Sequence, residues 1–360
     1  MDITKLGESA PDAAELLESS TEGVLMNENA EISEVDLALA GALEVNPRAE
    51  WSVLGATLGL APSTVSRRWA SLSARGEAWV TLAPGPRYLE AGSSAFLFLS
   101  TEPKRQNAVL EALCASPFFG TVSRMTGEYD VMADCFAPDY EELMDAISGV
   151  LSGLSGVSRW EVVLTTRLHR EGTQWRLGTL DPGQERALGA GTPSPRPARL
   201  GAVDAALVTA LSEDGRAGWE RLAAQVGVSP QTARRRTEQL LAGGHVTLRC
   251  DFSTAFRPRH REVTIVLSVP AAHLEQAGLF FADQPSCRVS AQVLGRGNLL
   301  ATFWVRDLLE VHALELRVLQ QIPSAVVLGR QAVVRTDKRS GHRLDGAGRS
   351  VGVVPLPLGG

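Results

Sequence analysis

The chain has 360 residues, of which 44% are hydrophobic, and a formal net charge of −6 at pH 7. This composition suits packed cores in two or three domains. No run approaches the about 20 apolar residues that a bilayer-spanning helix needs, and the acidic start argues against a signal peptide, so we expect a cytoplasmic protein without a membrane partner. The cysteines lack metal-ligand spacing, so we expect buried free thiols, no metal site and no cofactor. They are Cys114, Cys135, Cys250 and Cys287.

Most of the negative charge lies in residues 1–31, which hold eight acidic residues and one basic residue. Their net charge of −7 leaves the rest of the chain at +1. The overall charge therefore does not exclude a polyanionic partner. High charge without a helical apolar pattern predicts a disordered acidic leader over this segment.

Residues 32–82 are predicted to form three short helices followed by a strand. Apolar side chains recur at helical spacing in three runs, of which the second covers residues 51–58. Gly59 can supply the positive φ of the turn before the third helix, and Pro62 suits the first position of that helix. This order is typical of a winged helix-turn-helix, whose third helix enters the major groove of DNA.

Residues 93–170 alternate strand and helix patterns in the order β-α-β-β-α-β. This order predicts a ferredoxin-like module, in which an antiparallel four-stranded sheet carries two helices on one face. In residues 186–200, Gly and Pro replace the periodic pattern, as in a linker.

The whole unit returns 168 positions later without a gap. Corresponding pairs include Asp36 and Asp204, Arg48 and Arg216, Trp51 and Trp219, and Pro62 and Pro230. This register predicts a second helix-turn-helix domain over 201–249 and a second ferredoxin-like module over 261–336, before a disordered tail over 337–360. The predicted fold class is α+β, with two tandem units of a winged helix-turn-helix and a βαββαβ module. The linker permits the copies to pair within one chain or between chains.

The third helix of each copy presents polar and basic side chains on its predicted outward face. These side chains belong to Ser63, Thr64, Ser66, Arg67, Arg68, Gln231, Thr232, Arg234, Arg235 and Arg236. The predicted inward face consists of Val65, Trp69, Leu72, Ala233, Thr237 and Leu240. Arginine can bind guanine, glutamine can bind adenine, and hydroxyl groups can bind phosphate, so we predict that the outward residues contact double-stranded DNA. Alternatively, one of Arg68 and Arg236 braces the fold by pairing with an acid such as Asp36 or Asp204.

The motifs LGLAPSTVSRRWASL and TGEYDVM, in this arrangement of elements, resemble the Lrp/AsnC (leucine-responsive, feast/famine) family of transcriptional regulators. The resemblance covers roughly residues 33–170 and 201–336, as two fused copies. It implies a DNA-binding regulator whose sheet modules pair into dimers and higher homo-oligomers. It also implies a small effector, often an amino acid, near the turn between the second and third sheet strands.

The two copies differ at that turn. Its residues are Gly127, Glu128, Tyr129 and Asp130 in the first copy, and Gly295, Arg296 and Asn298 in the second. The first set is close to the family pattern Gly-Asp-x-Asp. A carboxylate such as that of Asp130 can receive the ammonium group of an amino acid, so we predict that an effector prefers the first module. The alternative is a tight hairpin with a solvated acid.

Two other functions compete with DNA-binding regulation. Siroheme decarboxylases resemble the same fold, but such chemistry would need histidines and arginines that converge in the sheet-module cavity, and the six histidines are scattered along the chain. We therefore expect no enzymatic activity. The third alternative is an assembly protein whose helix-turn-helix domains no longer bind DNA.

Overall fold

The computed structural model describes residues 32–189, 200–258 and 260–358. The predicted acidic leader over 1–31 and most of the linker over 186–200 lie outside these ranges. Among the described residues, no helix has the length and apolar character needed to cross a membrane.

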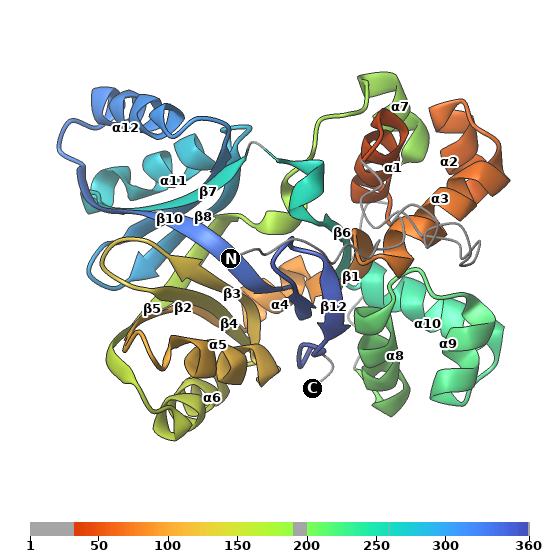
Figure 1. Cartoon of the computed structure of the whole chain (residues 1–360), viewed down its shortest axis with the longest axis horizontal. Helices are drawn as coiled ribbons and strands as arrows, with labels where there is room; N and C mark the ends of the chain where they lie inside the picture. Colours follow the sequence, from red (N-terminus) through yellow and green to blue (C-terminus); the bar gives the residue numbers. More distant parts are fainter. Residues whose placement is uncertain (1–31, 190–199, 259, 359–360) are drawn as a thin grey trace, which may run out of the picture. The chain divides into compact units, whose positions relative to one another are not determined.

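The first helix-turn-helix unit has the predicted order of three helices and a strand (Figure 1). Its elements are α1 (Glu34–Val45), α2 (Trp51–Leu58), α3 (Pro62–Ala74) and β1 (Ala78–Pro84). Ser33 begins α1 through a capping box with Asp36, and Gly59, at φ 67°, ends α2 in the left-handed conformation. Leu43 and Leu54 are completely buried between the helices. The predicted three-helix unit therefore has its own core.

The second unit repeats these elements. They are α8 (Ala202–Glu213), α9 (Trp219–Val226), α10 (Pro230–Ala242) and β6 (Val246–Phe252). Gly227 ends α9 at φ 73°, and Ser229 caps α10 by accepting a hydrogen bond from the Thr232 N–H. The turn glycine of the first unit therefore has an equivalent in the second, where a serine cap is added.

The wing strands of the two units pair with each other. Strand β1 runs antiparallel to β6, and Thr81 lies opposite Arg249. These two residues are 168 positions apart, so they are equivalent positions in the two copies of the repeat. The two units are therefore related by an approximate twofold axis that passes through this residue pair.

Each ferredoxin-like module also has the predicted order. The first contains β2 (Ser93–Thr101), α5 (Gln106–Ala115), β3 (Phe119–Met125), β4 (Val131–Ala137), α6 (Tyr140–Gly153) and β5 (Val157–Arg170). The second contains β7 (Arg261–Ser268), α11 (Leu274–Ala282), β8 (Cys287–Leu294), β9 (Leu299–Val305), α12 (Leu309–Gln321) and β10 (Val326–Arg339). In each module, two helices pack on one face of four strands (Figure 1).

The two modules close into one ring of eight strands. Strand β5 pairs with β2 of its own module and with β8 of the other, while β10 pairs with both β7 and β3. The interior face of the ring is apolar around Phe96, Phe98, Met132 and Leu300. The copies therefore pair within one chain, which decides between the two arrangements that the linker permits.

The structure differs from the sequence prediction after each module. Residues 171–189 include a short helix, α7 (Pro182–Leu188), which packs on α2 and overlaps the start of the predicted linker. The tail over 337–360 was expected to be disordered, but its described part forms β11 (His342–Leu344) and β12 (Ser350–Val353). Leu188 and Leu356, which correspond in the repeat, are buried in the cores of the first and second helix-turn-helix units. Leu188 has no apolar period around it, while Leu356 and the also buried Leu358 alternate with prolines, which are not typical of a regular strand.

The remaining short elements connect the larger ones. They are α4 (Pro86–Ala91), η1 (Gly172–Gln174), η2 (Thr254–Phe256) and η3 (Ala271–His273). The four cysteines are free and buried, as the sequence predicts.

Candidate functional site

Helix α3 presents the predicted outward face. Ser63 and Arg67 are exposed, whereas Thr64 and Ser66 are half-buried. The inward residues of α3 are buried, as the sequence predicts, and they are Val65, Trp69 and Leu72. The helix therefore offers one apolar face to its own unit and one polar face to solvent.

Helix α10 is arranged in the same way with a different polar surface. Gln231, Arg234 and Arg235 are exposed, and Thr232 is held at the helix start by Ser229, whose hydroxyl lies 2.9 Å from the Thr232 hydroxyl. The inward residues Ala233, Thr237 and Leu240 are buried. Arg234 also pairs with Glu238 one turn later, at 2.8 Å.

Helices α3 and α10, which we call the recognition helices, each contain one arginine that stabilises its own helix-turn-helix unit. Arg68 Nη1 lies 3.2 Å from the Asp36 carboxylate, and Arg236 Nη1 lies 3.3 Å from the Asp204 carboxylate. Both acids are buried, so each arginine compensates an otherwise costly buried charge. The alternative prediction, that one of Arg68 and Arg236 pairs with an acid of its own unit, therefore holds for both arginines.

Two further arginines join the helix-turn-helix units across the twofold axis. Arg48 donates hydrogen bonds to the carbonyl oxygens of Gly215 (2.6 Å) and Ala217 (3.0 Å), and its guanidinium lies 3.9 Å from the centre of the Trp219 ring. Burial lowers the pKa of Arg48 to about 10.

Arg216 makes the corresponding contacts in the opposite direction. It donates to the carbonyl oxygens of Pro47 (2.6 Å) and Ala49 (2.9 Å) and stacks on Trp51. The repeat preserves both the arginines and the tryptophans, but the sequence does not show that they exchange between units. We call Arg48 and Arg216 the reciprocal arginine pair. It links the segment between α1 and α2 to the segment between α8 and α9.

The turn residues that resemble an effector site have structural partners. The Asp130 carboxylate accepts a hydrogen bond from the Thr101 N–H at 2.7 Å. In the second copy, the Asn298 side-chain oxygen accepts from the Val269 N–H at 2.8 Å. These two contacts correspond in the repeat. The acid in the first copy and the amide in the second therefore both accept a hydrogen bond from the equivalent backbone N–H. Gly127 has a φ of 95°, which requires glycine at the hairpin.

The other turn residues of both copies meet at a single pocket. Glu128 pairs with Arg296 at 2.8 Å, although they belong to different copies. The Tyr129 hydroxyl donates to Glu161 at 2.7 Å, and burial together with this bond raises the pKa of Tyr129 to about 12. The pocket has a volume of about 190 Å³, and Gly297 also lines it, whereas the adjacent Gly295 is exposed. The turn residues of the two copies therefore line one shared pocket and not two separate sites. We call it the turn pocket.

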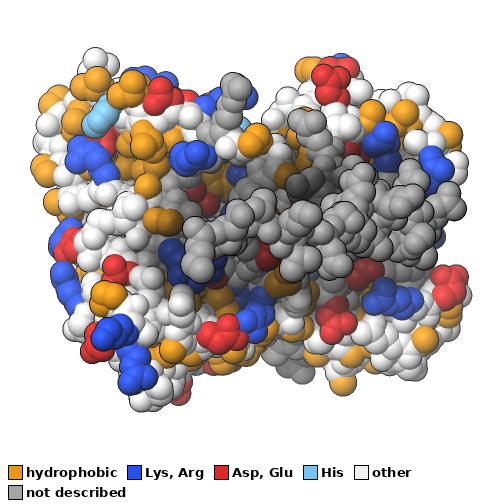
Figure 2. Space-filling model, in the orientation of Figure 1, with side chains coloured by type: hydrophobic (Ala, Val, Ile, Leu, Met, Phe, Trp, Pro, Cys, Tyr) orange, Lys and Arg blue, Asp and Glu red, His pale blue; other side chains and the backbone are white. Residues whose placement is uncertain are grey.

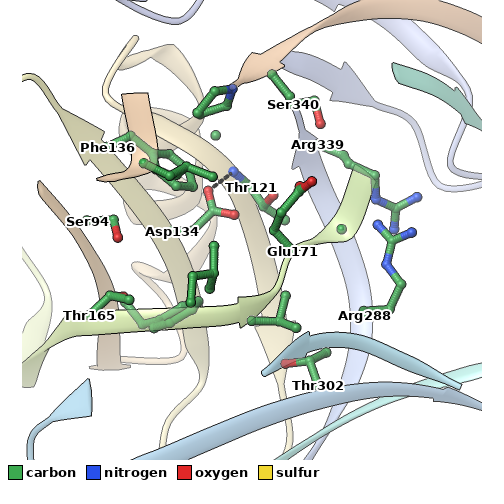
Figure 3. A pocket seen from close by; sticks show the side chains of 18 of the residues that line it. Ser94, Thr121, Asp134, Phe136, Thr165, Glu171, Arg288, Thr302, Arg339 and Ser340 are labelled. Atoms are coloured by element: carbon green, nitrogen blue, oxygen red, sulfur yellow. Dashed lines mark hydrogen bonds between the residues drawn. The ribbon is translucent and has the colours of Figure 1, made fainter. Parts of the chain in front are cut away.

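A second cavity lies at the interior face of the strand ring (Figure 3). It has a volume of about 120 Å³ and combines apolar side chains with arginines and carboxylates. Figure 3 shows Arg288 and Arg339 side by side, while Asp134 and Phe136 lie across the cavity from them. Burial raises the pKa of Asp134 to about 6. No motif in the sequence marks these residues.

Buried arginines surround Trp304 next to this cavity. The guanidinium groups of Arg257 and Arg288 lie 3.0 and 3.6 Å from the centre of the Trp304 ring. Burial and the neighbouring Arg249 lower the pKa of Arg288 to about 9. Arginines do converge near the cavity, as a siroheme decarboxylase site would require, but no histidine of the described chain lines it. The described residues also contain no group of His, Cys, Asp and Glu side chains that could hold a metal ion.

The surface beyond the recognition helices has mixed charge. On the face drawn in Figure 2, Lys and Arg side chains are interspersed with Asp and Glu over the parts that are not grey. No continuous basic band is visible on these parts.

Comparison with known proteins identifies most of these units. A model of the AsnC-type helix-turn-helix domain matches residues 32–73 and again residues 200–241, and a model of the Lrp/AsnC ligand binding domain matches residues 94–175. No curated protein matches the chain.

Solved structures align with this chain at low sequence identity. The siroheme decarboxylase NirDL, in complex with an iron-uroporphyrin III analogue, aligns with a TM-score of 0.54 at 14% identity over 85% of this chain and 93% of its own. A transcriptional regulator of Neisseria meningitidis in complex with L-Met aligns with a TM-score of 0.33 at 19% identity, over 38% of this chain and 90% of its own. AsnC of E. coli aligns with a TM-score of 0.32 at 17% identity, over 38% and 93%.

The two matched helix-turn-helix domains, the matched ligand binding domain and the tandem fold agree with the repeat in the sequence. The chain belongs to the Lrp/AsnC family and carries two copies of the family unit in one polypeptide.

Proposed function

We propose that the protein is a sequence-specific DNA-binding transcriptional regulator. The observation that carries this proposal is the pair Arg67 and Arg235, which are exposed at equivalent positions of α3 and α10. Within the described residues, neither guanidinium has a hydrogen bond or an ion pair. Both are therefore available for phosphate oxygens or guanine edges.

The two recognition helices are expected to bind unequal half-sites. Ser63 corresponds to Gln231 in the repeat, and Ser66 corresponds to Arg234. Glutamine suits adenine and arginine suits guanine, whereas serine discriminates less between bases. The operator should therefore be an imperfect palindrome, and footprinting should show different base contacts in its two halves.

An electrophoretic gel shift with DNA from upstream of the gene tests the proposal. The double variant R67A/R235A should bind at least tenfold more weakly than the wild type. The slope of log K against log salt should fall by about two, because two phosphate contacts are lost. R317A is a matched control, since Arg317 is exposed on α12 of a sheet module. Wild-type protein that shifts no DNA at low salt, or a double variant that binds like the wild type, would favour the assembly protein.

The effector proposal concerns the turn pocket. Glu128 and Glu161 supply carboxylates, while Arg296 and Arg330 supply positive charge. This combination suits both ends of an amino acid or a related small molecule. Since Glu161 lines the turn pocket and Asp130 does not, we infer that Glu161, and not Asp130, is the better candidate for the ammonium group. Calorimetric titration of amino acids into wild type and E161Q should show weaker binding to the variant, and equal affinities would contradict the assignment.

We also propose that the protein regulates transcription without being an enzyme. The ring cavity of about 120 Å³ is smaller than the roughly 300–1,000 Å³ of pockets for drug-sized ligands, so a tetrapyrrole would require its lining to move. Purified protein incubated with iron-uroporphyrin III should show no bound-tetrapyrrole absorbance after gel filtration. Retained absorbance would instead support decarboxylase chemistry.

A further inference from the structure

The cavity at the interior face of the strand ring contains a buried arginine, Arg288, that forms no direct ion pair with the described residues. Arg288 is only 9% exposed, lies on β8 and points into the cavity beside Arg339 (Figure 3). We propose that this cavity is a ligand site for a small aliphatic carboxylate, which binds to Arg288. It is separate from the turn pocket and does not depend on DNA binding.

Arg288 differs from the other arginines of the cavity. Arg249 pairs with Asp251 at 2.7 Å, and Arg339 lies 3.9 Å from Glu262. Arg288 has no hydrogen bond and no ion pair within the described chain, and its guanidinium instead stacks on Trp304 at 3.6 Å. A buried guanidinium without a partner is costly, and a bidentate carboxylate would compensate it.

The carboxylates of the cavity already accept hydrogen bonds. Asp134 accepts from the Thr121 N–H at 2.5 Å, Glu171 from the Thr173 N–H at 2.9 Å, and Glu262 from Trp304 Nε1 at 2.7 Å. Fewer of their lone pairs are therefore available for an ammonium group, whereas Arg288 on the other side of the cavity has no direct partner. The site should prefer an anion to an amino acid zwitterion.

The apolar part of the lining determines which hydrocarbon chain the carboxylate ligand can carry. Phe96, Met132, Leu168 and Val289 provide apolar walls. The volume of about 120 Å³ limits the occupant to a few carbon atoms beyond the carboxylate. A short branched aliphatic chain fits these walls better than a phosphate or a sugar.

The chain also leaves space for the guanidinium groups. A Cβ atom at Gly172 would lie 3.1 Å from Arg288 Nη2 and 3.2 Å from Arg249 Nη1. Glycine at this position therefore allows both arginines to reach the same end of the cavity.

Isothermal titration calorimetry on the full chain tests the site with four probes. The probes are 4-methylpentanoate, isopentylamine, L-leucine and inorganic phosphate. In the E161Q background, which weakens amino-acid binding in the turn pocket, we expect 4-methylpentanoate to bind, isopentylamine to give no binding heat, and L-leucine and phosphate to bind at least tenfold more weakly. R288Q should weaken binding of 4-methylpentanoate at least tenfold, while R296Q, a change in the turn pocket, should leave it unchanged.

A second variant tests the cavity independently, in case R288Q fails to fold. Thr165 lines the cavity without a side-chain hydrogen bond, so T165F should fill the cavity and abolish binding while Arg288 remains. Absence of binding by 4-methylpentanoate at millimolar concentration would overturn the proposal. Binding that survives both R288Q and T165F, or phosphate that binds as tightly as the carboxylate, would also overturn it. None of these outcomes bears on the gel-shift test of DNA binding.

Discussion

Adjacent arginines on each recognition helix have different tasks. Arg68 and Arg236 compensate buried carboxylates of α1 and α8, while Arg67 and Arg235 point to solvent. The sequence could predict which helix face carries them, because the period of the buried residues defines it. It could not predict which arginine meets an acid, since that depends on the packing angle between helices.

R68A tests this division. Loss of the ion pair leaves the buried Asp36 with only the Ser33 cap, so the free energy of unfolding should fall by about 1 kcal/mol. R67A should change it by less than about 0.5 kcal/mol. Urea denaturation of both variants measures the difference, and equal stabilities would show that the Arg68 pair contributes nothing.

Glu44 on α1 should make stability depend on pH. Burial raises its pKa from 4.5 to about 7 in the folded state. The neutral carboxyl group therefore contributes stability that is fully present below about pH 4.5 and is lost as the pH rises through 7. With 1.36 kcal/mol for each pKa unit, wild type should lose about 3 kcal/mol between pH 4.5 and 8 relative to E44Q. Urea denaturation of both proteins at the two pH values measures this, and parallel pH profiles would contradict it.

At the scale of elements, the segments that follow β5 and β10 are related parts of the repeat. Each brings a leucine to the core of a helix-turn-helix unit, Leu188 from α7 and Leu356 from the stretch after β12. The regular helices and strands could be predicted because their apolar residues recur with a period. These segments could not, because Leu188 has no apolar period around it and the prolines beside Leu356 and Leu358 argue against a regular element.

L356A should therefore destabilise the protein although it lies in the predicted disordered tail. Leu356 is 6% exposed, and removal of its side chain from the core should lower the unfolding free energy by about 2–3 kcal/mol. V351A is the control, since Val351 is 66% exposed, and it should have an effect below about 0.5 kcal/mol. Equal melting curves of L356A and wild type would show that the tail is not part of the fold.

Gly59 and Gly76 provide a second test of the tail. Both have a φ of 67°, but a Cβ atom at Gly59 meets nothing, whereas one at Gly76 would overlap the Ser350 carbonyl at β12. G59A should cost about 1–2 kcal/mol for the left-handed backbone alone. G76A should cost more and should increase proteolysis of the tail. A G76A variant with the same stability and the same proteolysis as G59A would contradict the contact with β12.

At the scale of the whole molecule, the two copies form within one chain the twofold arrangement that a dimer would form between chains. The repeat in the sequence is sufficient to predict both copies and their folds. It does not decide where they pair, since the linker has the composition for either arrangement. The turn pocket is likewise unpredictable, because Glu128 and Arg296 meet only through the closure of the ring.

Amide hydrogen exchange should show this intrachain pairing directly. Protection of β1 and β6 should not change when the protein is diluted a hundredfold, because their pairing does not depend on a second molecule. R48A/R216A, which removes the reciprocal arginine pair, should lower that protection at every concentration. Protection that declines on dilution of the wild type would indicate exchange between chains.

The closed ring has one consequence for how such molecules meet each other. All eight of its strands have a partner on both sides, so their backbone N–H and C=O groups are not available for strand addition. In the described chain, the outermost strand of the sheet is β12, which pairs only with β11. A closed sheet is protected from edge-to-edge aggregation. Higher assemblies of this protein must therefore use helices, loops, the short strand β12 or the outer edges of the two-stranded sheet β1–β6.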